Sequence, residues 1–252
     1  FYRAGFSVLC LETDYPTAIR RTVALSEAVY DGTAQVEDLA CHRVAGFDEV
    51  EPTLRRGLIP LLVDPEGDSI ARLRPAAVVD AILAKRNLGT HRGMAPITIA
   101  LGPGFCAGQD VDAVIETMRG HNLGRLYLHG EAIPNTGVPG EVGGQSEKRV
   151  IHAPVAGAVK PIKNIGDVVH AGEAILTIEQ HLVKAPFTGL LRGLIRPGLS
   201  VPKGMKIADV DPRIETDYYT ISDKARCLGG AALEAYFYLL NSKNSSGEPH
   251  DN

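Results

Sequence analysis

The sequence predicts an α/β protein with a partly parallel sheet, joined to a second and smaller all-β domain. Two observations carry this prediction. Over residues 1–130, short apolar runs alternate with segments of helical spacing, and the runs end in acidic or glycine-rich loops, as the strands of a parallel sheet do. Residues 151–180 then match residues 183–212 without a gap, which indicates a domain built from two similar halves.

The composition bounds the class of protein and its partners. The chain has 252 residues, enough for two modest domains, and 44% of them are hydrophobic. Its net charge is −4 with acidic and basic residues interspersed, which argues against nucleic acid as a partner and against attachment to an anionic membrane. The four cysteines show no CxxC spacing, and no apolar stretch approaches the length of a membrane span, about 18 residues. We therefore expect a cytoplasmic protein.

The first twelve residues have the pattern of the second half of a nucleotide-binding strand–helix–strand unit, namely the end of the helix and the strand that follows it. Residues 1–5 have the pattern of a helix end with its glycine, and residues 6–12 form an apolar strand. This strand ends in Glu12, the position from which an acidic side chain binds a ribose in a Rossmann-like sheet. We expect a strand, a loop and most of a helix upstream of Phe1.

Helical spacing continues from Pro16 to Asp31, with Arg20 and Arg21 in the first turn, where they either bind an anion or face solvent. Strands and helices then alternate. We expect a short β element at residues 34–36, a helix at 48–56, strands at 58–63, 76–81 and 96–101, and a hairpin of residues 111–118 and 123–129.

Ligands of Rossmann-like sheets bind at the carboxyl ends of the strands. The loop of residues 102–108 follows one such strand and is rich in glycine, so its N–H groups either hold a phosphate or belong to a tight structural turn. This loop lacks the lysine with which a P-loop contacts phosphate. The sequence contains no HExxH motif, and we therefore expect no metal ion. The candidate ligand-binding residues are Glu12, Arg20, Arg21, Asp64, Asp80, Gly102, Gly104, Gly108 and Arg119.

The repeat predicts the fold of the second domain. Its glycines break each half into short strands, and two such halves related by a pseudo-twofold axis make a barrel-sandwich hybrid. Seven residues recur identically at a spacing of 32, namely Ala153, Pro154, Gly157, Gly166, Val169, Gly172 and Ile175 as Ala185, Pro186, Gly189, Gly198, Val201, Gly204 and Ile207.

In fold, this domain resembles the biotinyl and lipoyl carrier domains. Those carriers present a modified lysine on an extended hairpin between the two halves. Here the junction, residues 177–184, is too short for such a hairpin, and its only lysine, Lys184, stands at the ordinary entry to the second half. We therefore expect neither biotin nor lipoate.

The domain boundaries follow from these assignments. We expect a Rossmann-like domain at residues 1–148, incomplete at its N-terminus, and the barrel-sandwich hybrid at 149–213. Ser222 is suited to cap a helix that begins at Asp223, and we expect residues 214–242 to pack back on the first domain. The polar residues 243–252 are predicted to be disordered.

Several stretches together point to one family. They are residues 18–23 with 27–30, 62–65, 79–81 with 84–87, 101–105, 114–121, 135–137, and 211–213 with 221–225. In this combination the chain resembles the YqeB-type accessory proteins of selenium-dependent molybdenum hydroxylases.

The resemblance implies a factor that matures a molybdenum hydroxylase of the xanthine dehydrogenase type. The hydroxylase would be its partner, and a nucleotide or a molybdopterin dinucleotide would bind in the α/β domain. Two alternatives stay open. One is an NAD(P)-dependent oxidoreductase in which Lys85 or His121 donates a proton, and the other is an adaptor that binds no ligand. A homo-oligomer is compatible with the sequence.

Overall fold

The computed structural model describes residues 1–137, 140–141, 143–145 and 147–245, and it divides into two compact units. Unit 1 contains Phe1, Glu66–Gly137 and Ser222–Asn252, and unit 2 contains Tyr2–Pro65 and Val138–Ile221. These units divide the chain differently from the expected boundary at residue 148. Residues 2–65 group with the β-rich domain, because residues 19–31 form hydrogen bonds and ion pairs with Leu194, Arg196 and Asp209 of that domain.

The first sheet of unit 2 is the α/β part of that unit. Its strands are β1 (Cys10–Glu12), β2 (Thr33–Val36), β3 (Leu39–Val44) and β4 (Ile59–Val63), in the order β1-β4-β3-β2. Strands β1, β4 and β3 are parallel, and β2 is antiparallel to β3. The predicted strand at residues 58–63 and the β element at 34–36 are thus confirmed.

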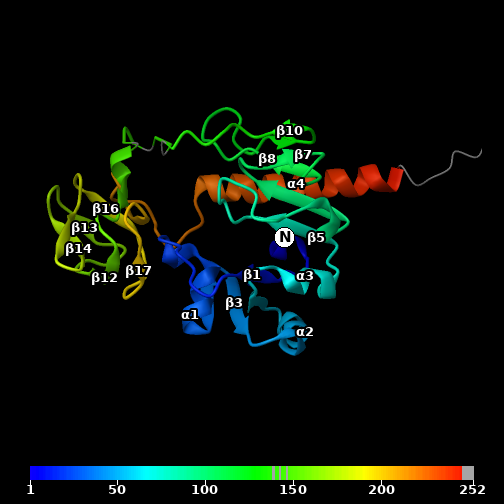
Figure 1. Ribbon diagram of the computed structural model, residues 1–252, viewed down its shortest axis with the longest axis horizontal. Coiled ribbons are helices and arrows are strands. Elements are labelled where there is room, and N and C mark those ends of the chain that lie inside the picture. Colours follow the sequence, from blue (N-terminus) through cyan, green and yellow to red (C-terminus); the bar gives the residue numbers. More distant parts are fainter. Residues whose placement is uncertain (138–139, 142, 146, 246–252) are drawn as a thin grey trace, which may run out of the picture. The chain divides into compact units, whose positions relative to one another are not determined.

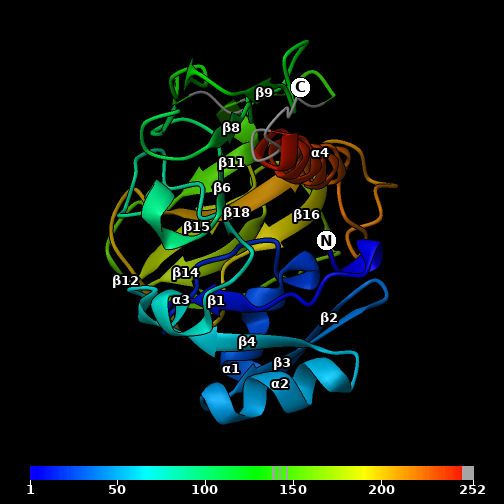
Figure 2. The same cartoon turned by 90° about the vertical axis from the view of Figure 1, so that its right-hand side faces the viewer.

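Helices cover both faces of this sheet. Along β4, Ile59 and Leu61 pack in one cluster with α1 (Ala28–Asp31), whereas Leu62 packs in another with α2 (Phe47–Arg55). Figure 1 shows α1 and α2 on either side of β3, and Figure 2 shows α2 along β3 and β4. The alternation of side chains along a strand thus explains why β4 is apolar throughout. The predicted helix at residues 48–56 is confirmed.

The segment before α1 differs from the long helix predicted from Pro16. It consists of two short 3-10 helices, η2 (Arg21–Val23) and η3 (Leu25–Glu27), that follow a 3-10 turn at the start of the chain, η1 (Tyr2–Ala4). The backbone leaves the helical conformation at Ala24, with φ of −127° and ψ of 116°, and the Ile19 carbonyl accepts a hydrogen bond from the Leu194 N–H at 2.7 Å. Sequence spacing alone does not reveal such a partner.

Two further sheets of unit 2 form a β-sandwich that follows the repeat. The first copy supplies β11 (Val150–His152), β12 (Gly157–Pro161), β13 (Val168–Val169) and β14 (Ala174–Ile178). The second copy supplies β15 (His181–Lys184), β16 (Gly189–Leu194), β17 (Ser200–Val201) and β18 (Lys206–Asp211). One sheet has the order β11-β18-β16-β13, and the other has β15-β14-β12-β17.

If each strand of the first sheet is replaced by the equivalent strand of the other copy, the strand order of the second sheet results. Each sheet therefore contains two strands from each copy. This exchange is what a pseudo-twofold axis between the halves requires. Equivalent residues of the two copies meet in one core, among them the fully buried Ile175 and Ile207, and Ile19 joins them from outside the repeat. The two sheets stay open and do not close into a barrel. Between β14 and β15, only Glu179 and Gln180 form the turn.

Unit 1 contains the second partly parallel sheet. Its strands are β5 (Ala77–Asp80), β6 (Ile97–Leu101), β8 (Ala113–Ile115) and β9 (Leu126–Tyr127), in that order, with only β9 antiparallel to its neighbour. The predicted strands at 76–81 and 96–101 and the hairpin are confirmed. The unit also contains β7 (Cys106–Ala107) paired with β10 (Gly130–Glu131), α3 (Asp68–Leu73) and the 3-10 helix η4 (Arg92–Met94).

Helix α4 (Asp223–Ser245) packs on β6 and β8 of this sheet, as Figure 1 shows. Its first turn is capped by Ser222, whose Oγ accepts a hydrogen bond from the Ala225 N–H at 3.3 Å, as the sequence predicted. A last 3-10 helix, η5 (Glu147–Arg149), precedes β11 in unit 2. The tail predicted to be disordered falls partly outside the described residues, since these end at 245.

The α/β fold class is confirmed, with one difference in its layout. The strands of residues 1–130 form two four-stranded sheets rather than one, because both edges of β4 are taken by β1 and β3, and β5 begins a new sheet with β6. No helix in the described part of the chain combines the length and the apolar character that crossing a membrane requires.

Candidate anion-binding site

Three parallel strands of unit 1, β5, β6 and β8, end at the same edge of their sheet, where ligands of α/β sheets bind. Asp80 closes β5 and is buried. Its carboxylate accepts hydrogen bonds from the Ile82 N–H at 3.0 Å and from the Thr90 hydroxyl at 2.6 Å. Both carboxylate oxygens of Asp80 thus hold the following loop.

We call this loop, residues 81–95, the cationic loop. Its backbone is fixed from within, because the Asn87 amide donates to the Thr90 carbonyl at 2.9 Å and accepts from the Gly89 N–H at 2.8 Å. Arg92 fixes its far end, donating to the Gly108 carbonyl at 3.1 Å and to the Asp112 carboxylate at 3.0 Å. The loop is therefore held to its surroundings at several points along its length.

The cationic loop exposes two positive charges. Lys85 and Arg86 are both exposed, and neither side chain forms a hydrogen bond or an ion pair with any residue that the structure describes. Leu83 and Lys85 have left-handed backbone conformations, with φ of 59° and 66°, which are uncommon for residues with a side chain. Such backbone strain is typical of ligand-binding loops, where surrounding contacts hold it in place.

The glycine loop, residues 102–108, packs directly against the cationic loop. At Gly104, with φ of 104°, an added Cβ would lie 2.5 Å from the Cα of Arg86, and at Gly102 it would lie 2.7 Å from the Thr117 hydroxyl. Glycine is therefore required at both positions by close packing as well as by backbone conformation. This agrees with the tight structural turn that the sequence left open.

Three N–H groups of the glycine loop are already paired within the chain. The Gly102 N–H donates to the Ile115 carbonyl, the Cys106 N–H to Asp110, and the Gly108 N–H to the Val111 carbonyl, each at 2.8 Å. These groups are not available to a phosphate. The cations beside the loop, Lys85 and Arg86, are the groups that could hold one.

The predicted binding residues are split between the two units. Asp80, Gly102, Gly104, Gly108 and Arg119 lie in unit 1, whereas Glu12, Arg20, Arg21 and Asp64 lie in unit 2. Arg119 forms a bidentate ion pair with Asp223 in the first turn of α4, at 2.8 and 3.0 Å. Its charge is thus already paired within unit 1.

In unit 2, two predicted residues do meet. Glu12 ends β1 and Asp64 directly follows the adjacent parallel strand β4, and the Asp64 N–H donates to the Glu12 carbonyl at 2.9 Å. The Glu12 carboxylate accepts from the neighbouring Thr13 N–H at 2.8 Å. The structure therefore places two carboxylates at one sheet edge of unit 2, as expected for strands that run in parallel.

The two adjacent arginines of unit 2 serve as attachments. Arg20 forms an ion pair with Asp209 at 2.5 Å, and the Arg21 guanidinium donates to the Leu194 carbonyl at 2.8 Å and lies 3.6 Å from Glu27. From the sequence, we expected Arg20 and Arg21 either to bind an anion or to face solvent. In the structure they instead contact groups of the protein itself. They fix residues 19–27 to the β-sandwich.

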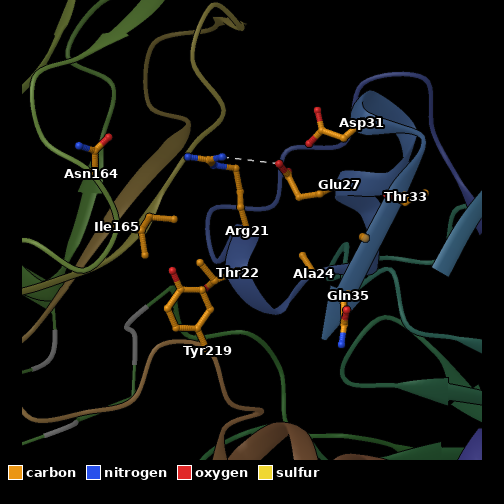
Figure 3. Close-up of a pocket in the computed structure, with 11 residues that line it drawn as sticks. Arg21, Thr22, Ala24, Glu27, Asp31, Thr33, Gln35, Asn164, Ile165 and Tyr219 are labelled. Carbon is orange, nitrogen blue, oxygen red and sulfur yellow. Dashed lines mark ion pairs between the residues drawn. The ribbon is translucent and has the colours of Figure 1, made fainter. Parts of the chain in front are cut away.

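A pocket of about 420 Å³ opens beside this attachment (Figure 3). The Arg21–Glu27 ion pair crosses it, and Tyr219 lies at its rim with 60% of its surface exposed. The other lining residues are Thr22, Ala24, Asp31, Thr33, Ala34, Gln35, Asn164 and Ile165. The pocket is of ligand size, but Arg21 is the one predicted residue that lines it.

The edge of unit 1 thus combines a fixed loop, two exposed cations and a sheet end, and it suits an oxyanion such as a phosphate. The ligand-binding residues predicted from the sequence did not include Lys85 and Arg86. The sequence did contain a signal for them, because these two adjacent cations lie in the loop that follows the strand ending in Asp80. The described residues contain no group of three or more histidine, cysteine or acidic side chains that could hold a metal ion.

Comparisons with known proteins give one strong relative. No family model matches the sequence. The chain is 50% identical over 241 residues to the "Uncharacterized protein YqeB" of Escherichia coli K12, and this alignment covers 95% of the chain but 44% of the relative. The chain therefore spans less than half the length of this curated relative.

Two solved structures share low similarity with the chain. The ectoine utilization protein EutE (DoeB) of Ruegeria pomeroyi has 14% identity and a TM-score of 0.27, and a succinylglutamate desuccinylase/aspartoacylase of Rhodobacter sphaeroides has 14% and 0.26. Each likeness covers 81% of this chain and 84% of the other, and at such scores neither informs on fold or function. Over nearly its whole length the chain is thus similar to part of YqeB, with half of the aligned residues identical.

Proposed function

We propose that the protein is a maturation factor for a selenium-dependent molybdenum hydroxylase, and that it binds the phosphate groups of a nucleotide or of a nucleotide-bearing cofactor. The role in maturation rests on the sequence resemblance described above. The binding rests on one observation, the exposed and unpaired Lys85 and Arg86 on a fixed loop at the carboxyl edge of a parallel sheet.

The chemistry of these two side chains suits a phosphate. A guanidinium offers a planar fork of N–H donors that matches two phosphate oxygens, and an ammonium adds a compact charge. The hydrogen bonds of Asp80 and Thr90 hold the loop before the ligand arrives, so less conformational entropy is lost on binding. Lys85 and Arg86 would bind and orient the ligand, and the β-sandwich would contact the hydroxylase.

Native mass spectrometry of the full-length protein, purified from its own host, tests this proposal. We expect a non-covalent adduct with the mass of a nucleotide or a molybdopterin dinucleotide, which disappears in the denatured spectrum. The double variant Lys85→Gln/Arg86→Gln should lose the adduct. The pair Arg55→Gln/Arg56→Gln, adjacent exposed cations at the end of α2, serves as the matched control and should keep it.

Other outcomes would point elsewhere. A bare mass in both spectra, together with capture of the hydroxylase, would favour the ligand-free adaptor. A nicotinamide adduct with consumption of NADH would favour the oxidoreductase. A covalent biotinyl or lipoyl increment would contradict the expectation that the sandwich carries neither group.

A further inference from the structure

The function proposed above does not use the pocket of unit 2, which we call the Arg21 pocket. Its volume of about 420 Å³ is that of a small-molecule site, and every residue that lines it belongs to unit 2. Charged side chains line it together with amide and hydroxyl groups and with the apolar surfaces of Ile165 and Tyr219 (Figure 3). Such a lining suits a small polar ligand that has an apolar part.

Arg21 brings unused hydrogen-bond donors to this pocket. Its Nε donates to the Leu194 carbonyl at 2.8 Å, which fixes the guanidinium in place. Its Nη1 lies 3.6 Å from a Glu27 carboxylate oxygen, a distance longer than a hydrogen bond. Neither Nη atom of Arg21 thus donates a hydrogen bond to a residue that the structure describes, although the side chain is only 23% exposed. A fork of N–H groups of this kind binds a carboxylate through both its oxygens.

Glu27 brings an unused acceptor to the same pocket. The residue is only 8% exposed, and its contacts are made by Oε2, which accepts from Arg196 at 2.9 Å and lies at the longer distance from Arg21. Among the described residues, none donates a hydrogen bond to the other oxygen, Oε1. A carboxylate so largely buried gains from a donor at each oxygen, so Oε1 favours a ligand that carries one.

Arg196 holds the acidic side of the pocket in place. It donates to Glu27 and to both carboxylate oxygens of Asp31, at 2.8 and 2.5 Å. Its guanidinium also lies over the Tyr30 ring, 4.5 Å from the centroid. Arg21 can therefore exchange its long contact for a ligand without leaving Glu27 unpaired.

We infer that the Arg21 pocket binds a free α-amino acid. The carboxylate of the ligand would accept the Nη N–H groups of Arg21, and its ammonium would donate to Oε1 of Glu27. An α-amino acid carries these two charges close together, as the pocket carries its donor and acceptor, 3.6 Å apart. A zwitterion adds no net charge, whereas the carboxylates of Glu27 and Asp31 would repel a dianion such as phosphate. The ligand's side chain would contact Ile165 and Tyr219.

Calorimetric titration of the full-length protein with each standard L-amino acid tests the inference. The Lys85→Gln/Arg86→Gln background is used throughout, so that the cationic loop does not contribute. We expect at least one amino acid to bind with saturation. Arg21→Gln and Glu27→Gln should each weaken this binding at least about tenfold, the effect of losing a hydrogen bond to a charged group. The amide of the same amino acid, which lacks the carboxylate, should bind the parent protein more weakly by a similar factor.

A second variant keeps the test decisive if Arg21→Gln does not fold. Thr33 is exposed on β2 and lines the pocket, so Thr33→Trp narrows the pocket at a surface position and should abolish binding. The control is Arg55→Gln, which removes an exposed arginine paired with Glu51 on α2 and should leave the affinity unchanged.

Three results would overturn the inference. They are the absence of binding by every amino acid tested, binding that Arg21→Gln or Thr33→Trp leaves unchanged, and an amide that binds as tightly as the acid. The inference does not depend on the proposed phosphate site, since Lys85 and Arg86 lie in the other unit. The two proposals therefore fail separately.

Discussion

At the scale of single residues, the clearest result is that the glycine loop and the cationic loop depend on each other. The sequence left two roles open for Gly104, a phosphate contact or a tight structural turn, and in the structure this glycine lets the Arg86 backbone approach. A sequence pattern can indicate that a glycine is needed, but not whether a ligand or a neighbouring loop needs it. The same holds for Arg20 and Arg21, whose partners lie more than 150 residues away along the chain.

We predict that Gly104→Ala destabilises the protein by about 2–4 kcal/mol, because its Cβ would collide with the Arg86 backbone and its φ is left-handed. Gly120→Ala is the matched control, since its φ of 128° is also left-handed but no atom lies within 4 Å of the added Cβ. It should cost only about 1 kcal/mol. Urea unfolding measures both, and equal losses would show that the contact with Arg86 contributes nothing.

A second prediction concerns the pH dependence of stability. Burial raises the pKa of Asp211, but hydrogen bonds and charge from Arg213, together with Arg192, outweigh it and lower this pKa to about 2. Because the folded pKa is below that of the unfolded chain, this carboxylate stabilises the fold above about pH 4 and ceases to do so as the pH falls toward 2. The contribution is on the order of 2 kcal/mol.

Urea midpoints measured from about pH 5 to about pH 2 test this assignment. The wild type should lose stability steeply in that window. Asp211→Asn should be less stable at pH 5 and should show a weaker dependence on pH. Parallel pH profiles for the two proteins would mean that Asp211 does not titrate as described.

At the scale of secondary structure, the sequence predicted correctly those strands and helices whose formation depends on the local pattern of apolar residues. The strand at residues 96–101 is buried at nearly every position, the helix at 48–56 buries one face through Val50 and Thr53, and both form nearly as predicted. The repeat predicted two equivalent halves of the sandwich, and the structure adds that each sheet takes two strands from each half. The segment from Pro16 to Asp31 was wrong as a single helix, since its backbone is bonded to β16 instead.

The N-cap of α4 gives a prediction at this scale. Ser222→Ala removes the acceptor of the Ala225 N–H and should destabilise the protein by about 1 kcal/mol. Ser222→Asp keeps an acceptor and adds a favourable charge at the helix N-terminus, so it should restore the stability. Thermal unfolding distinguishes them, and the cap would be unimportant if the alanine variant melted like the wild type.

At the scale of the whole molecule, the two units have separate cores. The sandwich core of unit 2 includes Ile207, and the sheet of unit 1 includes Ile99, and both side chains are fully buried. The sequence indicated two domains and assigned residues 2–65 to the first, whereas these residues group with Val138–Ile221 in the structure, because hydrogen bonds and ion pairs join the two segments. The division of the predicted binding residues between the units has the same origin.

We predict that Ile207→Ala and Ile99→Ala each cost about 2–5 kcal/mol, but that each acts on its own unit. Hydrogen–deuterium exchange should rise mainly in β12 to β18 for the first variant and mainly in β5 to β8 for the second. Exchange that rises equally in both units for either variant would show that the chain unfolds as one cooperative body.

Calorimetric titration of the full-length protein with ATP, GTP, CTP and NADH tests the proposed phosphate site at Lys85 and Arg86. We predict that at least one nucleotide binds and that Lys85→Gln/Arg86→Gln weakens this binding at least tenfold, whereas Arg55→Gln/Arg56→Gln leaves it unchanged. Both variants remove two exposed cations, so a general effect of net charge would weaken both equally. Nucleotide binding that survives the loss of Lys85 and Arg86 would show that these two side chains do not hold the phosphates.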